Sequence, residues 1–155
     1  VSFHSMLGTW SKEVDVFIAY SQFAMQKFIE GGLPKEKLAF KTNFLHPAPE
    51  PGDGKGGYAL FVGRLSVEKG LGVMLDAWRQ LKGKIPLKIL GNGPMASLVT
   101  EAAQDMPEIE WLGRRPLEEV YEVVGKAAFL VFPSEWYETF GRVAIEAFAR
   151  GTPVV

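Results

Sequence analysis

Two carboxylates near the end of the chain have the residue type and the spacing to bind or act on a hydroxylated ligand. Glu138 and Glu146 are eight positions apart and follow an apolar, strand-like segment from Ala127 to Phe132. On one continuous helix their side chains would be about 12 Å apart along the axis, at about 1.5 Å per residue. The carboxyl pairs of glycosidases are closer, at about 5 Å in retaining enzymes and under about 10 Å in inverting ones. The spacing therefore favours two separate binding roles.

The junction between the two acids suits an anionic group. Gly141 lies between them, where the apolar strand gives way to a helix predicted from Gly141 to Arg150. Backbone amides that point outward at a helix N-terminus favour a phosphate. Glu146 is embedded in an apolar stretch of this helix, so we expect its carboxylate to need a polar partner.

Strand and helix patterns alternate regularly along the second part of the chain. This alternation predicts a Rossmann-like α/β fold, a parallel sheet with helices on both faces. The expected strand and helix pairs are Tyr58–Val62 with Leu71–Leu81, Leu87–Leu90 with Met95–Gln104, Ile109–Leu112 with Leu117–Val124, and Ala127–Phe132 with Gly141–Arg150, before a fifth strand at Pro153–Val155. Ligands of such sheets bind beyond the carboxyl ends of the strands.

A segment rich in proline and glycine, residues 47–57, divides the chain unequally. It cannot form a helix or a central strand and predicts a linker or long surface loop. Before it, Val14–Tyr20 is typical of a buried strand, and Ser21 can cap a helix that runs to about Glu30. Because the chain starts at Val1 and stops at Val155 inside an expected strand, we expect a fragment of a longer protein.

The loop after the first strand of the second part, residues 63–70, carries two cations. Gly63 permits close backbone approach, and Arg64 and Lys69 could both contact a diphosphate. Alternatively, both are solvated loop charges, and Glu68 pairs with one of them. The two acids and this G-R-L-x-x-E-K-G run together resemble the retaining glycosyltransferases of family 4 (group 1), which have the GT-B fold and an E-x7-E motif in their donor site.

The resemblance implies a role for each site residue. Arg64 and Lys69 would neutralise the leaving diphosphate, Glu146 would bind the ribose hydroxyls, and Glu138 would bind hydroxyls of the donor sugar. Contacts with the sugar or its phosphates would come from the backbone amides of Thr139, Phe140 and Gly141. The implied catalytic residues are thus Arg64, Lys69 and Glu138, and Gly63 and Arg114 belong to the donor-binding set.

The same resemblance implies the organisation and activity of the protein. Residues 1–46 would end an N-terminal acceptor-side domain, residues 47–57 would be the interdomain linker, and residues 58–155 would be an incomplete donor-binding domain. The expected activity is transfer of a hexose from a UDP- or GDP-sugar to a saccharide or lipid-linked acceptor, in bacterial polysaccharide biosynthesis. The fragment alone is expected to be inactive.

Two further loops leave alternatives open. Gly91, Gly93 and Ala96 satisfy the G-x-G-x-x-A dinucleotide fingerprint, and Glu110 follows near the spacing of a ribose-binding acid, so an NAD-binding oxidoreductase is the rival enzyme class. Against it, the fingerprint should follow the first strand of the fold, and the family has a similar turn in which Pro94 would be the first residue of a helix. Arg114 and its neighbour Arg115 either contact a nucleobase or are surface residues.

Composition excludes several other classes of protein. The 155 residues carry a net charge of −1 with scattered basic residues, which argues against a nucleic-acid partner. No cysteine is present, His4 and His46 are far apart, and no D-x-D motif occurs, so we expect no metal and no cofactor, the nucleotide sugar being a substrate. No apolar run approaches the ~20 residues that span a bilayer. We expect a cytoplasmic protein and leave open peripheral contact at the inner membrane face.

Two non-transferase hypotheses also fit these residues: a non-catalytic nucleotide-binding module, and a GT-B nucleotide-sugar epimerase. A serine hydrolase does not fit, because Ser134 lies outside a G-x-S-x-G elbow and has no histidine nearby. Trp136 and Tyr137, next to Glu138, could wall a sugar pocket or only pack the loop.

Overall fold

The computed structural model describes residue 4 and residues 6–155, which divide between Phe44 and Leu45 into two compact units. In the first unit, strands β1 (Phe17–Ala19) and β2 (Leu38–Phe40) pair in parallel, with Phe17 opposite Leu38. The helical elements of this unit are α2 (Thr9–Glu13), α3 (Gln22–Glu30) and η1 (Lys35–Lys37). The Ser21 hydroxyl accepts a hydrogen bond from the Ala24 amide at 3.0 Å, which confirms the predicted helix cap.

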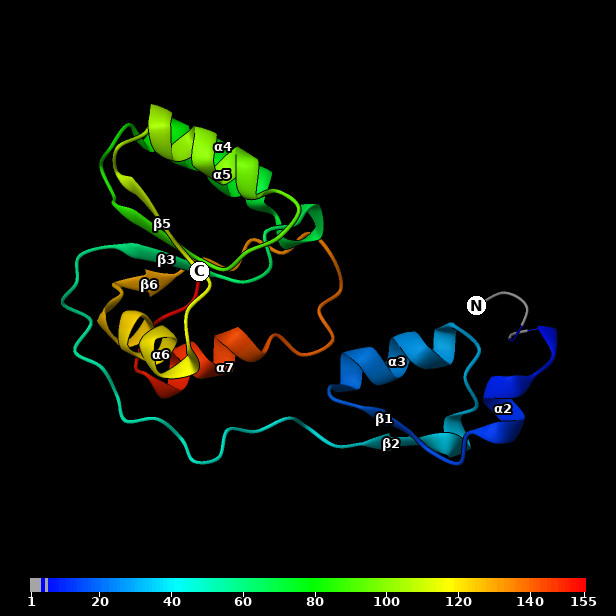
Figure 1. Ribbon diagram of the computed structural model, residues 1–155. Coiled ribbons are helices and arrows are strands. Elements are labelled where there is room, and N and C mark those ends of the chain that lie inside the picture. Colours follow the sequence, from blue (N-terminus) through cyan, green and yellow to red (C-terminus); the bar gives the residue numbers. More distant parts are fainter. Residues whose placement is uncertain (1–3, 5) are drawn as a thin grey trace. The chain divides into compact units, whose positions relative to one another are not determined.

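The second unit is a parallel sheet with strand order β5-β4-β3-β6 (Figure 1). Val154 forms a further parallel bridge to Leu130, so the predicted fifth strand begins where expected. The elements of this unit are β3 (Ala59–Val62), η2 (Val67–Lys69), α4 (Leu71–Leu81), β4 (Leu87–Leu90), α5 (Ala96–Asp105), β5 (Ile109–Gly113), α6 (Leu117–Lys126), β6 (Phe129–Leu130) and α7 (Arg142–Ala149).

Helices cover both faces of this sheet, which confirms the predicted fold class. Alternate residues of the central strand β3 face opposite ways. Phe61 packs in the core beneath α4 and α5, and Leu60 packs in the core shared with α6 and α7 (Figure 1). Both side chains are almost completely buried, and each contributes about 1.5–3 kcal/mol of stabilisation.

Several details differ from the expectations. Strand β1 is shorter than the predicted buried strand Val14–Tyr20, and Ile18 within it is exposed. Helix α2 and strand β2 were not expected, because five-residue and three-residue elements carry too little periodicity to recognise. Strand β6 is shorter than predicted, although backbone bonds from Val131 and Phe132 continue its ladder. The prediction that Pro94 opens a helix was wrong: α5 begins at Ala96, and Pro94 lies in the turn before it.

Residues 47–57 form neither helix nor strand, but they are fixed to the second unit. The Gly52 amide donates to the Arg150 carbonyl at 2.8 Å, and the Gly54 amide donates to the Gly125 carbonyl at 3.0 Å. The Arg150 guanidinium also donates to the Glu50 carbonyl. The segment is therefore anchored along α6 and α7 over most of its length. No helix among the described residues is long and apolar enough to cross a membrane.

Candidate functional site

The order of the strands brings together two loops that are far apart in sequence. Strands β4 and β6 flank β3 on opposite sides. The chain adds β4 and then β5 on one side of β3, and then crosses back to form β6 on the other side. In doubly wound sheets, ligands bind in the crevice beyond the carboxyl ends of the strands at such a switch point. The loops after β3 and β6 carry the predicted cations and the first acid of the motif.

Close backbone packing joins these two loops. Gly70 has a φ of 66°, and a Cβ at this position would overlap the Pro133 carbonyl oxygen. The Glu135 amide donates to the Glu68 carbonyl at 3.0 Å. Leu65 anchors the first loop because its side chain is completely buried in the core under α4. A position with positive φ and no room for a Cβ requires glycine, so Gly70 sets the distance between the loops.

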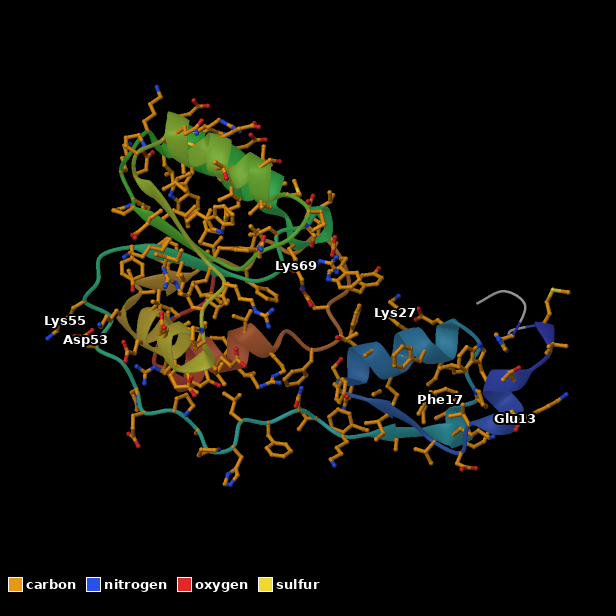
Figure 2. The ribbon with its side chains drawn as sticks, viewed as in Figure 1. Glu13, Phe17, Lys27, Asp53, Lys55 and Lys69 are labelled. Carbon is orange, nitrogen blue, oxygen red and sulfur yellow. The ribbon has the colours of Figure 1, made fainter. Side chains whose placement is uncertain are left out.

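Lys69 and Glu138 meet across this junction. Lys69 Nζ lies 2.5 Å from Glu138 Oε1, and the two side chains are 24% and 18% exposed. Figure 2 shows Lys69 in the loop that joins β3 to α4. The Ser134 hydroxyl donates to the same Glu138 oxygen at 2.5 Å, and the Lys69 ammonium lies 5.5 Å from the centre of the Trp136 ring. The structure thus joins two predicted site residues that are 69 positions apart in sequence.

The surroundings of Glu138 favour its ionised form. Partial burial acts to raise the pKa of this carboxyl, but hydrogen bonds from Lys69, Ser134 and Trp136, together with the charge of Lys69, outweigh it and hold the pKa below its ordinary value. Glu68 does not pair with either cation of its loop through a hydrogen bond; it accepts one from the Ser66 hydroxyl at 2.7 Å. Lys69 is therefore left to bridge to the neighbouring loop.

Glu146 lies on α7 and has a different environment. Arg142, one turn earlier, approaches it at 3.3 Å, and the Glu146 side chain is only 13% exposed. Burial raises the pKa of Glu146, and the charge and hydrogen bond of Arg142 offset this only in part. The expectation of a polar partner is confirmed, but that partner is 60% exposed and lies at the helix surface.

The glycines of the G-x-G-x-x-A turn are used for packing. A Cβ at Gly91 would overlap the Gly63 carbonyl oxygen, and one at Gly93 would overlap the Leu65 carbonyl oxygen. The Leu65 amide donates to the Asn92 carbonyl at 3.1 Å, and the Met95 amide donates back to Leu65 at 2.9 Å. The close backbone contacts require glycine at both positions, so the spacing of the glycines does not need a bound dinucleotide to explain it.

Glu110, the acid that the dinucleotide interpretation needed, does not lie free at a ribose site. Its carboxylate pairs with Lys88 of the neighbouring strand at 3.0 Å. Because both the glycines and the acid have structural partners, the fingerprint carries little support for NAD binding.

A cavity of about 180 Å³ opens at the carboxyl ends of β3 and β4. Gly63 and Arg114, both predicted donor-binding residues, line it together with Val62, Leu90 and Arg115. Arg115 also donates to the Leu112 carbonyl at 2.9 Å and pairs with Glu119, so its guanidinium has local structural partners. Arg114 is exposed at the mouth of the cavity.

The other predicted site residues are less closely gathered. Arg64 and Thr139 are exposed, Phe140 is half-buried, and Gly141 is the N-cap residue of α7. Within the described part of the chain, no hydrogen bond or ion pair joins Arg64 or Glu146 to the Lys69–Glu138 pair. Also within that part, no three His, Cys, Asp or Glu side chains gather as metal ligands would.

The sequence interpretation missed one residue of the site. Ser134 was considered only as a hydrolase nucleophile, yet its hydroxyl bonds to Glu138 four positions later. A serine directly after a proline at a strand end, four residues before an acid, was the available signal.

The strand order, the helices on both faces and the charged switch point define a doubly wound, Rossmann-like α/β domain. The solved structure of Anabaena HepE in complex with UDP and glucose is similar: the TM-score is 0.76 at 22% identity, over 90% of this chain and 43% of that one. The expected GT-B type of fold is thus confirmed.

The chain belongs to the family described as glycosyl transferases group 1, whose sequence profile matches residues 45–155. It is 39% identical over 108 residues to a D-inositol 3-phosphate glycosyltransferase of Corynebacterium efficiens, covering 61% of this chain and 25% of that protein. It is 32% identical over 105 residues to an uncharacterized glycosyltransferase of Methanocaldococcus jannaschii, covering 66% of this chain and 29% of that protein. The chain thus spans well under half the length of these relatives.

Proposed function

We propose that the second unit binds the nucleoside-diphosphate sugar of a hexosyltransferase, and that transfer proceeds with retention and without a metal ion. The observation that carries this proposal is the Lys69–Glu138 contact at the switch point of the sheet. It places a cation for a diphosphate next to an acceptor for sugar hydroxyls. These are the two chemical groups that a nucleotide sugar carries side by side.

Each side of the pair keeps capacity for a ligand. A lysine ammonium has three N–H donors, and Glu138 uses one of those of Lys69. The remaining two can bind phosphate oxygens, with Arg64 on the same loop as a second cation. The N-terminal amides of α7, with those of Thr139, Phe140 and Gly141, supply further donors for an anion.

The nucleoside half has candidate contacts on the same edge of the sheet. Glu146 accepts hydrogen bonds from the ribose hydroxyls, because its carboxylate is largely buried and, among the described residues, has only Arg142 as a charged partner. The base occupies the cavity beside Gly63 and Arg114. Glu138 then accepts hydrogen bonds from hydroxyls of the donor sugar.

In the transfer step, the bond between the anomeric carbon and the diphosphate oxygen breaks, and its electron pair stays on that oxygen. Lys69, Arg64 and the amides at the start of α7 stabilise the negative charge that develops there. The acceptor hydroxyl attacks the oxocarbenium-like carbon from the same face, and its proton passes to the leaving phosphate. No residue in this scheme requires a divalent metal.

For the whole protein, we propose that residues 1–46 end an acceptor-side domain, residues 47–57 link the domains, and residues 58–155 belong to the donor domain. The acceptor is a saccharide or a lipid-linked saccharide, and the protein works in the cytoplasm, with peripheral contact at the membrane for a lipid acceptor. One relative is named a D-inositol 3-phosphate glycosyltransferase and another a glycogen synthase, so we assign acceptor choice to residues outside this chain.

The proposal is tested by titration calorimetry of the full chain with UDP, GDP, ADP and NAD, each in EDTA and again with magnesium. We expect one nucleoside diphosphate to bind in EDTA, with no added affinity from magnesium and no heat from NAD. Binding of NAD alone would establish the oxidoreductase alternative, and binding that needs magnesium would contradict the metal-free scheme. Hydrolysis or epimerisation of the bound sugar without an acceptor would favour the epimerase.

A further inference from the structure

The hydrogen bonds around Glu138 include one donor that the proposed donor-sugar contact does not itself require. Besides Lys69, the Ser134 hydroxyl donates to the carboxylate at 2.5 Å. Glu138 lies in an irregular loop, between the end of β6 and the start of α7, so no helix or strand fixes its backbone. Its orientation therefore depends on these side-chain contacts.

Ser134 is well placed to transmit the rigidity of the sheet to this loop. It follows Pro133, whose carbonyl packs against Gly70 so closely that a Cβ would overlap it. Two residues earlier, the Phe132 amide is bonded to the Val155 carbonyl at 2.8 Å. Ser134 is thus attached to the end of the β6 ladder, whereas Glu138 is four residues further into the loop.

The two donors leave room for a ligand. An ionised carboxylate offers about four lone-pair sites, and Lys69 and Ser134 occupy two of them. About two sites are left, which sugar hydroxyls can fill. Since Lys69 and Ser134 both bond to Oε1, the orientation of the carboxylate about its terminal bond is restricted before any ligand arrives.

We propose that Ser134 is a positioning residue that orients the Glu138 carboxylate toward the donor sugar, an inference that rests on the proposed donor site. Its hydroxyl fixes one carboxylate oxygen from the strand end. The Trp136 ring lies beside the Lys69 ammonium, the other donor to that oxygen. Removing the Ser134 hydroxyl affects recognition of the sugar and spares that of the diphosphate.

The test uses two variants of the full chain, Ser134→Ala and Ser134→Thr. Affinities for UDP and UDP-glucose, and for GDP and GDP-mannose, are measured by calorimetry. We expect Ser134→Ala to weaken binding of the nucleotide sugar roughly fivefold to tenfold, while the affinity for the free diphosphate changes less than about twofold. Ser134→Thr, which keeps the hydroxyl, restores the affinity for the sugar.

A second measurement does not depend on any ligand. The titration of Glu138 is followed by NMR of the carboxyl carbon, and Ser134→Ala should raise the pKa of Glu138, because a hydrogen bond that lowers it is lost. Ser66→Ala is the matched control: it removes a serine hydroxyl bonded to Glu68 in the adjoining loop, so it should raise the pKa of Glu68 and leave that of Glu138 unchanged.

The two measurements separate the inference from the function on which it rests. An unchanged Glu138 pKa in Ser134→Ala would overturn the positioning role whatever the chain binds. Equal losses of affinity for the nucleotide sugar and for the free diphosphate would also overturn it. If the unaltered chain bound neither UDP nor GDP, the proposed function would fail, while the NMR titration would still decide whether Ser134 holds Glu138.

Discussion

The loop that carries Glu138 and the helix that carries Glu146 contain the same acid in opposite environments. Glu138 accepts hydrogen bonds from Lys69 and Ser134 and has a lowered pKa, whereas Glu146 has one exposed arginine partner and a raised pKa. Burial acts on both in the same direction, so the number of donors makes the difference. Glu138 is thus held and charge-compensated before a ligand binds, and Glu146 is a largely buried acceptor whose charge has little compensation until hydroxyl groups reach it.

An E-x7-E spacing therefore does not by itself assign a role to either acid. An acid fixed by a cation suits a contact next to a diphosphate, and an under-compensated acid gains most from neutral donors such as ribose hydroxyls. Four sets of variants test this contrast between Glu138 and Glu146.

The Gly70→Ala variant should disrupt the packing of the loop that carries Lys69 against the loop that carries Glu138. The new Cβ meets the Pro133 carbonyl at a positive φ, so the loops must separate, and the free energy of unfolding should fall by about 2–4 kcal/mol. Chemical denaturation measures this loss. Gly72→Ala is the control, because a Cβ there meets nothing within 4 Å. It should be neutral or stabilise by up to about 1 kcal/mol; equal losses in the two variants would contradict the loop contact.

Lys69→Ala should weaken binding of the diphosphate group and leave the affinity for the nucleoside almost unchanged. We expect a loss of about 1.5–3 kcal/mol in UDP binding, the range for charged hydrogen bonds, and almost no change for uridine. Arg64→Ala should act in the same direction. The control is Lys88→Ala, since Lys88 is a similarly exposed lysine paired with an acid away from the proposed diphosphate contacts. If uridine lost as much affinity as UDP, calorimetry would rule out the diphosphate role.

Glu146 should make nucleoside binding depend on pH. Ribose hydroxyls donate to the ionised carboxylate, so affinity for uridine should decline as pH falls toward the raised pKa of Glu146, above the ordinary value of 4.5. Glu146→Gln should cost about 0.5–1.5 kcal/mol near neutral pH and remove this dependence. Calorimetry of uridine at several pH values measures both. A Gln variant that kept the same pH profile would assign the titration to another group.

The smallest expected effect is that of the two carboxylates on the free energy of unfolding. Because the pKa of Glu138 is lowered by folding, its contribution to stability is present above the ordinary value of 4.5 and is lost as pH falls through the folded pKa. Glu146 has a raised pKa, so acid favours the fold at that site. Near neutral pH, Glu138→Gln should destabilise and Glu146→Gln should stabilise, each by less than about 1 kcal/mol. Denaturation midpoints that moved in the same direction would contradict the contrast.

Much of the second unit follows from its sequence pattern. Helix α4 runs from Leu71 to Leu81 as predicted, because its apolar face repeats with helical period and Gly70 marks its start. Strand β4 is also where its apolar run placed it. In the first unit, β2 was missed because Leu38–Phe40 is too short and is flanked by lysines.

For the site, sequence predicted the loops but not their contacts. That Lys69 and Arg64 follow β3 and that Glu138 follows β6 is visible in the pattern, since ligands bind at the carboxyl ends of parallel strands. That Lys69 reaches Glu138, and not Glu68 of its own loop, depends on which strands are neighbours and on the absence of a side chain at Gly70. Neither the strand order nor a backbone overlap can be derived from local periodicity.

The most direct test of the proposed donor site is a crystal structure of the chain with UDP-glucose bound, grown in EDTA. We expect the diphosphate to lie against Lys69 and the start of α7, the ribose hydroxyls to bind Glu146, and the glucose hydroxyls to bind the Glu138 carboxylate while Ser134 still holds it. A nucleotide bound elsewhere on the sheet, or a diphosphate that contacts neither Lys69 nor α7, would contradict it.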